Sequence, residues 1–136
     1  MVVGSPSTEQ LKERVKSYLE LVDSGRYDEL FAHLSAGVVY QTIRGRPPIV
    51  GASDLIRFYK ETRPPGSGVH EVAYFIAEDG KVACLLRMKG VLGDGSTLAF
   101  EAVDLFTFEG GKIVSIRTFS DLPPALPGYA PPPSAP

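Results

Sequence analysis

An aspartate stands inside an aromatic row in the segment STLAFEAVDLFTF, residues 96–108. If this segment is a strand, alternation puts one set of side chains on the same face: Phe100, Ala102, Asp104, Phe106 and Phe108. An ionised carboxylate is costly in such surroundings. Asp104 should therefore pair with a cation, or its pKa should rise until it is a neutral hydrogen-bond donor. A structural aspartate that caps a backbone group or faces a dimer contact fits the same pattern.

Two tyrosines on predicted helices could complete a site around this carboxyl group. Tyr18 and Tyr59 both fall on apolar helix stripes, where a tyrosine is more often a core residue with its hydroxyl on a backbone carbonyl. Taken together with Asp104, they allow a second interpretation. Two phenols and a carboxyl group can converge as preorganised donors for a developing oxyanion.

The element that carries Tyr18 is a helix predicted over SPSTEQLKERVKSYLELVDSG, residues 5–25. Ser7 and Gln10 have the spacing of a capping box, and Gly25 is placed to end the helix. Its inward stripe consists of Leu11, Val15, Tyr18, Leu19 and Val22.

Two further helices are expected before the four long strands. The shorter one runs roughly from Tyr27 to Leu34 and should bury Leu30, Phe31 and Leu34. The other begins at Ser53 and continues through DLIRFYKET, which includes Tyr59 and ends before two prolines.

The strand pattern begins at VVYQTIRGRPPIVG, residues 38–51, which reads as a strand followed by a tight turn because prolines cannot continue a ladder. Four long strands with short turns follow, and they form an antiparallel meander: VHEVAYFIA, KVACLLRMKGVL, STLAFEAVDLFTF and KIVSIRTF. Helices first and strands last predict an α+β domain whose curved sheet is covered on one face by helices.

Composition narrows the class of protein. We expect a flexible segment at 1–6, one domain over 7–121 and a proline-rich tail at 122–136. The net charge of -2, with both signs interspersed, argues against nucleic acid as a partner. The chain lacks a targeting pattern and a long apolar run, so a cytoplasmic protein is the default. One cysteine and two histidines without close spacing predict no metal and no cofactor.

The order of these residues resembles a known family. YLELVDSG, GRPPIVGASDLIRFY and EAVDLFTFEGGKI are similar to stretches of the bacterial ketosteroid isomerases, in the nuclear transport factor 2-like superfamily that also holds the SnoaL-like polyketide cyclases. The resemblance implies a cone-shaped α+β fold, a deep apolar cavity and a homodimer. It also implies that Tyr18 and a protonated Asp104 donate to a dienolate oxygen, while Tyr59 supports Tyr18.

The general base is where the sequence departs from that family. An aspartate just before the proline turn relays the proton in the isomerases, and Thr42 takes its position here. A threonine hydroxyl is not basic enough near neutral pH, whereas Tyr40 could reach the same cavity in a positioning or donating role. Glu101 would need a bulge to reach it. His33 and His70 are interpreted as solvated or capping residues.

Three hypotheses for the function of the protein remain open, and each involves a small hydrophobic ligand. The leading hypothesis is an enzyme that stabilises the enolate or alkoxide of a polyketide- or steroid-like carbonyl compound during isomerisation, cyclisation or dehydration. The others are acid-assisted opening of an epoxide, with Glu101 as the candidate base, and a binding domain without catalysis. The pocket wall is expected to include Val22, Thr42, Phe58, Phe100, Ala102, Phe106, Thr118 and Ser120.

Overall fold

The computed structural model describes residues 6–42, 47–62, 68–91, 95 and 97–120. The predicted tail at 122–136 lies outside the described residues, and so does all but the last position of the predicted segment 1–6. In the domain between them, as predicted, all helices precede the last four strands, although two strands come before the last helix.

Helix α1, Thr8–Asp23, begins at the predicted capping box. Ser7 Oγ accepts from the Gln10 backbone N–H at 3.2 Å, and the Gln10 side chain accepts from the Ser7 N–H at 2.8 Å. These two bonds satisfy donors that a helix start otherwise leaves without partners. Every residue of the predicted inward stripe is buried, which confirms the face assignment: Leu11, Val15, Tyr18, Leu19 and Val22.

The second helix is shorter and tighter than predicted. It is a 3-10 helix, η1, over Tyr27–Ala32, and Leu34 already belongs to the following strand. Three residues per turn align positions three apart, so Tyr27 and Leu30 share the buried face. The prediction that Phe31 is buried was wrong, because this geometry turns its side chain outward to 47% exposure.

Helix α2, Ala52–Thr62, follows a two-residue strand, β2, at Ile49–Val50. Gly51 joins them with a positive φ of 99°, a conformation that residues with a side chain rarely adopt. The buried face of α2 holds Ala52, Leu55, Ile56 and Tyr59.

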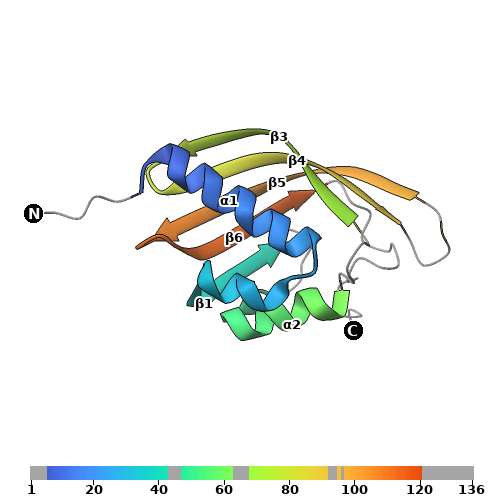
Figure 1. The fold of residues 1–136 in the computed structure, drawn as a ribbon, viewed down its shortest axis with the longest axis horizontal. Helices are drawn as coiled ribbons and strands as arrows, with labels where there is room; N and C mark the ends of the chain where they lie inside the picture. The colour runs from blue at the N-terminus through green and yellow to red at the C-terminus, as the bar shows by residue number, and fades with distance from the viewer. Residues whose placement is uncertain (1–5, 43–46, 63–67, 92–94, 96, 121–136) are drawn as a thin grey trace, which may run out of the picture.

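The strands form one six-stranded sheet of order β2-β1-β6-β5-β4-β3. They span Leu34–Thr42 (β1), Gly68–Glu78 (β3), Lys81–Val91 (β4), Thr97–Glu109 (β5) and Lys112–Ser120 (β6). The last four form the predicted antiparallel meander. β1 pairs with β6 in parallel, so the sheet is mixed. Figure 1 shows α1 lying across one face of this curved sheet, with α2 beside β1, which confirms the α+β class.

Strand β3 contains a one-residue bulge. Val72 pairs with Leu86 and Tyr74 pairs with Leu85, which leaves Ala73 as the extra residue. A bulge reverses the alternation of side chains beyond it. Before it Val69 and Glu71 face outward, and after it Tyr74 and Ile76 do so, at 56% and 62% exposure.

The core lies between the helices and the inner face of the sheet. Its largest fully buried side chains include Tyr18, Phe106, Leu30 and Leu55. Within the described residues, no helix combines the length and the apolar character needed to cross a bilayer.

Candidate active site

A cavity of about 30 Å³ lies between α1, α2 and the inner face of the sheet. This volume accommodates about two water molecules. Eight of the residues named from the sequence line it: Tyr18, Val22, Tyr40, Tyr59, Phe100, Ala102, Asp104 and Thr118. Leu19, His70, Leu86, Met88 and Ile116 complete the wall.

The two helix tyrosines meet at this cavity. The hydroxyls of Tyr18 and Tyr59 are 2.6 Å apart and form a buried hydrogen bond in which either can donate. Phe106 packs edge-on against the Tyr18 ring at 5.7 Å, and Tyr27 stacks on the Tyr59 ring at 6.1 Å. Aromatic contacts of this kind restrict the side-chain rotamers, so both hydroxyls are held in place.

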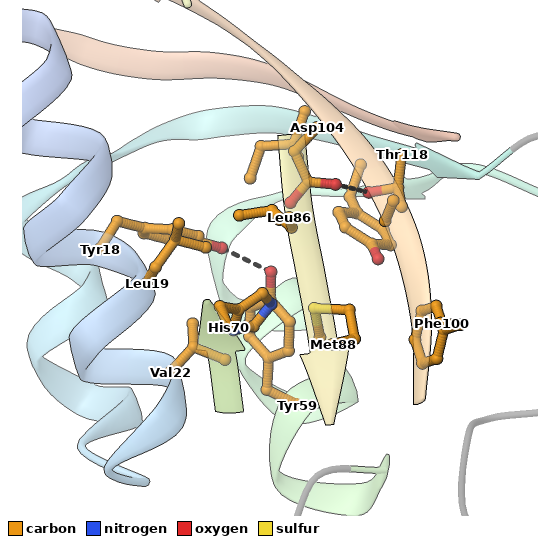
Figure 2. Close-up of a pocket in the computed structure, with 13 residues that line it drawn as sticks. Tyr18, Leu19, Val22, Tyr59, His70, Leu86, Met88, Phe100, Asp104 and Thr118 are labelled. Carbon is orange, nitrogen blue, oxygen red and sulfur yellow. Dashed lines mark hydrogen bonds between the residues drawn. The ribbon is translucent and has the colours of Figure 1, made fainter. Parts of the chain in front are cut away.

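Asp104 occupies the inner face of β5, as the alternation predicts, and is 8% exposed. It lies between Cys84 on β4 and Thr118 on β6 in the sheet register. The Thr118 hydroxyl donates to Oδ1 of Asp104 at 2.7 Å. Figure 2 shows the Asp104 carboxyl group above the paired tyrosine hydroxyls in that view. One carboxyl group and two phenols therefore surround a single cavity.

Strand β1 contributes Tyr40 to the cavity wall. Its ring lies 6.2 Å from the Tyr59 ring and 5.7 Å from Phe58, which packs behind it and is not among the residues that line the cavity. The backbone of Thr42 pairs with Thr118, while its side chain lies outside the described part of the structure.

Two other residues predicted for the pocket wall are not among those that line this cavity. Phe106 is fully buried behind Tyr18 as a core residue. Ser120 is partly buried at the end of β6, one pleat beyond Thr118. Both lie on the correct strands, but the pleat alone does not define how far the cavity extends along them.

His70 was interpreted from the sequence as a solvated or capping residue, and that interpretation was wrong. Its side chain is 5% exposed and lines the cavity. Its Nδ1 lies 2.5 Å from Oδ1 of Asp23, and its backbone N–H donates to Oδ2 of Asp23 at 2.9 Å. The strand alternation through Val72 could have indicated an inward face. The partner could not be found, because Asp23 lies 47 residues earlier.

Glu101 stays on the outer face of the sheet, with its side chain 59% exposed. It lies 4.0 Å from Arg87, which also pairs with Glu71 at 3.7 Å, and Lys89 lies 3.4 Å from Glu71. Arg87 and Lys89 therefore also lie on the outer face. The register between β4 and β5 is unbroken through Glu101, so no bulge turns this carboxylate inward.

Cys84 is buried beside Asp104 on the neighbouring strand. Burial is the main cause that raises the pKa of its thiol, and the charge of Asp104 adds to the effect. A thiol with a raised pKa is a poor nucleophile, so Cys84 serves as a small core residue.

The sequence and the structure of the chain were compared with those of known proteins. Residues 15–116 match the model of the SnoaL-like domain family, so the chain belongs to that family. No curated protein matches the chain. Because the match covers most of the chain, the family assignment applies to the whole domain.

Solved structures agree on the architecture. A putative SnoaL-like polyketide cyclase from Jannaschia sp. CCS1 gives a TM-score of 0.75 at 21% identity, covering 89% of this chain and 92% of that one. A putative ketosteroid isomerase from Kribbella flavida gives 0.72 at 23% identity, with 93% and 85% covered. An LEH-like epoxide hydrolase from M. tuberculosis gives 0.72 at 19% identity, with 85% and 86% covered. These likenesses establish the nuclear transport factor 2-like fold.

Proposed function

We propose that the chain is a cofactor-independent enzyme that stabilises the enolate or alkoxide of a hydrophobic carbonyl substrate. The observation that carries this proposal is the convergence of Tyr18, Tyr59 and Asp104 on one buried cavity, with the two hydroxyls 2.6 Å apart. Isomerisation, intramolecular cyclisation and dehydration of a polyketide- or steroid-like compound each pass through such an oxyanion.

The roles follow from the contacts. Tyr18 donates to the substrate oxygen, and Tyr59 donates to Tyr18, so that the negative charge is shared along a chain of hydrogen bonds. Asp104 donates a second bond in its neutral form, which its burial favours. Tyr40 orients the ligand from the β1 side. Donors fixed before the reaction lower its barrier because they need no reorganisation.

The size of the cavity adds a condition for binding. A space for about two water molecules is smaller than a fused-ring ligand, so the ligand has to displace wall side chains as it enters. Met88 and Phe100 are the wall residues suited to this role, since Met88 is unbranched and Phe100 is only partly buried.

Binding of 2-naphthol, a planar fused-ring phenol that mimics a bound enolate, tests the oxyanion hole. Because each donor contributes about 1 kcal/mol or more of binding free energy, we expect Tyr18→Phe and Asp104→Ala each to weaken its affinity at least about fivefold. Fluorescence titration measures the dissociation constants. Tyr74→Phe is the matched control, because Tyr74 is 56% exposed on the outer face of the sheet.

Equal affinity in the native protein and in both site variants would overturn the proposal. A ligand-binding role without catalysis would then be the better account. Epoxide opening is less favoured than enolate chemistry, because its candidate base, Glu101, points away from the cavity.

We also propose that the chain assembles as a homodimer through the outer face of its sheet. Tyr74, Leu85, Val103 and Phe119 form one cross-strand row on that face. Tyr74 and Val103 are 56% and 37% exposed, and an apolar row of this kind favours a protein contact.

A further inference from the structure

We propose that His70, oriented by Asp23, is the general base that Thr42 cannot supply. The inference rests on the proposed function, because it assigns the proton transfer that would accompany the oxyanion. His70 projects from β3 into the group of side chains around the cavity (Figure 2). It reaches the site from a different strand than the one where the sequence resemblance places the base.

Asp23 fixes the tautomer of the His70 ring. An ionised carboxylate can only accept hydrogen bonds, so the proton in the 2.5 Å contact with Asp23 belongs to Nδ1 of His70. The other carboxylate oxygen accepts from the His70 backbone N–H at 2.9 Å. In a neutral imidazole with Nδ1 protonated, the basic lone pair is on Nε2, at the ring edge away from Asp23.

Asp23 lies where a carboxylate is unfavourable, and its contacts with His70 offset this cost. Asp23 is the last residue of α1, where the helix dipole disfavours a negative charge. The Asp23 carboxylate is 19% exposed and the His70 side chain 5% exposed, so solvent screens neither well. Two N–H donors from one residue offset the unfavourable placement. The result is an imidazole held rigidly at the cavity wall.

The charged and titratable groups around His70 come from four of the elements that form the cavity, since the lining residues of β4 and β6 do not titrate. Asp23 and Tyr18 lie on α1, Tyr59 on α2, Tyr40 on β1 and Asp104 on β5. Asp23 contacts Nδ1 of His70, and the other four residues line the cavity together with His70. Base and oxyanion donors therefore share one small space, which proton abstraction next to a carbonyl requires.

The proposed step balances without any other reactant. Nε2 of His70 removes a proton from the carbon next to the carbonyl, the C–H electron pair becomes the C=C bond, and the carbonyl π electrons move to oxygen. Tyr18 and Asp104 stabilise that oxygen. In a β,γ-unsaturated ketone the imidazolium returns its proton to the γ carbon of the dienolate, while the electron pair on oxygen re-forms the C=O bond and the enolate C=C pair forms the new Cα=Cβ bond, which completes the isomerisation. In a β-hydroxy ketone the same two electron shifts break the Cβ–OH bond, and the hydroxyl takes the proton from the imidazolium and leaves as water.

Hydrogen–deuterium exchange of 2-tetralone, a fused-ring ketone, measures this proton transfer without knowledge of the natural substrate. We expect the native protein to accelerate exchange at the carbon next to the carbonyl, and His70→Gln to lower the rate at least about a hundredfold. His33→Gln is the matched control, because His33 lies at the end of η1 and is not among the residues that line the cavity. It should exchange at the native rate.

Asp23→Asn tests the positioning role with a nearly isosteric change. We expect exchange at saturating 2-tetralone to fall at least about tenfold, while the half-saturating concentration changes less than twofold. Nitrogen NMR of the imidazole should show protonated Nδ1 in the native protein and a mixture of tautomers in the variant. If the contact between Asp23 and His70 were purely structural, Asp23→Asn would lower the melting temperature. It would leave the tautomer and the exchange rate at saturating 2-tetralone unaltered.

The results separate this inference from the proposed function. If His70→Gln exchanges within threefold of the native rate, His70 is not the base. The inference also fails if the native protein binds 2-naphthol through Tyr18 but catalyses no exchange, although the oxyanion hole then stands. If naphthol binding does not depend on Tyr18, the proposed function itself fails. Should His70→Gln not fold, an unaltered tautomer or an unaltered rate in Asp23→Asn overturns the inference.

Discussion

At the scale of single residues, the Tyr18–Tyr59 bond is the contact on which the proposed chemistry most directly depends. Tyr59 has a ring neighbour on two sides, Tyr27 and Tyr40, so its hydroxyl cannot easily leave Tyr18. A hydrogen bond received by Tyr18 makes its own proton a better donor to a ligand. Tyr59 is thus expected to act through Tyr18.

The expected consequence is a non-additive pair of substitutions. Tyr59→Phe should weaken 2-naphthol binding about fivefold, which corresponds to about 1 kcal/mol. In a Tyr18→Phe background the same change should have less than about a twofold effect, because the intermediary is gone. Fluorescence titration of the four proteins measures both effects. Equal effects in the two backgrounds would show that Tyr59 acts independently.

Residue identity explains which parts of the site the sequence could predict. Periodicity assigned Tyr18, Tyr59 and Asp104 to inward faces, since each face follows from local spacing alone. His70 was missed because its role depends on a contact with Asp23 that spans 47 residues. The spacing of residues along one strand does not show which side chain of another element lies opposite.

At the scale of elements, α1, η1 and β6 are joined by polar contacts at the end of the fold away from the cavity. Arg14 donates to the Gly111 carbonyl at 2.6 Å, and Lys112 donates to the Ala32 carbonyl at 2.6 Å. The Ile113 N–H donates to the carbonyl of His33 at 2.8 Å. Two cations therefore surround a histidine at this junction.

This junction should make stability sensitive to acid. Burial lowers the pKa of His33, and the charges of Lys112 and Arg14 lower it further. The unfolded chain then takes up a proton at a higher pH than the folded one. Stability is therefore lost as the pH falls below about 6.5, whereas above that pH both states are neutral.

Urea unfolding at about pH 7.5 and about pH 5 checks this expectation. The unfolding free energy of the native protein should drop more between the two values than that of His33→Gln. A drop of equal size in both proteins would show that other groups cause the acid sensitivity.

Some features of the helices and strands could be predicted from local sequence patterns, and others could not. The capping box at Ser7 and the turns at Gly80 and Gly111 have short-range signatures, and the structure contains all three. The 3-10 form of η1 and the parallel pairing of β1 with β6 do not, because both depend on how distant segments pack. The bulge at Ala73 is likewise absent from the pattern of apolar residues.

At the scale of the whole molecule, helices cover one face of the sheet, while the other face is open as far as the described residues go. The open face combines the apolar row that includes Tyr74 and Val103 with the charged group Glu71, Arg87, Lys89 and Glu101. A mixed surface of this kind suits a two-fold contact, in which each copy presents both parts to the other.

Sedimentation equilibrium tests the proposed homodimer. We expect a mass twice that of the 14.7 kDa chain at micromolar concentration. Ile76→Asp should give the monomer mass, because Ile76 is 62% exposed on the outer face two residues from Tyr74, so the new charge lies next to the apolar row and away from the cavity. Phe31→Asp is the control, since Phe31 is 47% exposed on η1, away from the outer face. A native protein that sediments as a monomer would contradict the proposal.

The extra residue at Ala73 divides β3 into two parts whose registers with β4 differ by one residue. His70 and Val72 belong to the interior ahead of it, while Tyr74 and Ile76 belong to the exterior behind it. Deleting Ala73 would remove the extra residue and leave a regular ladder in which Val72 still faces the interior and Tyr74 still faces the exterior. A regular ladder that kept Ala73 would instead turn Tyr74 and Ile76 inward, so the ligand side and the assembly side would exchange residues beyond this point. A deletion at Ala73 should therefore preserve both surfaces, whereas a change that abolishes the bulge without shortening the chain would alter both at once.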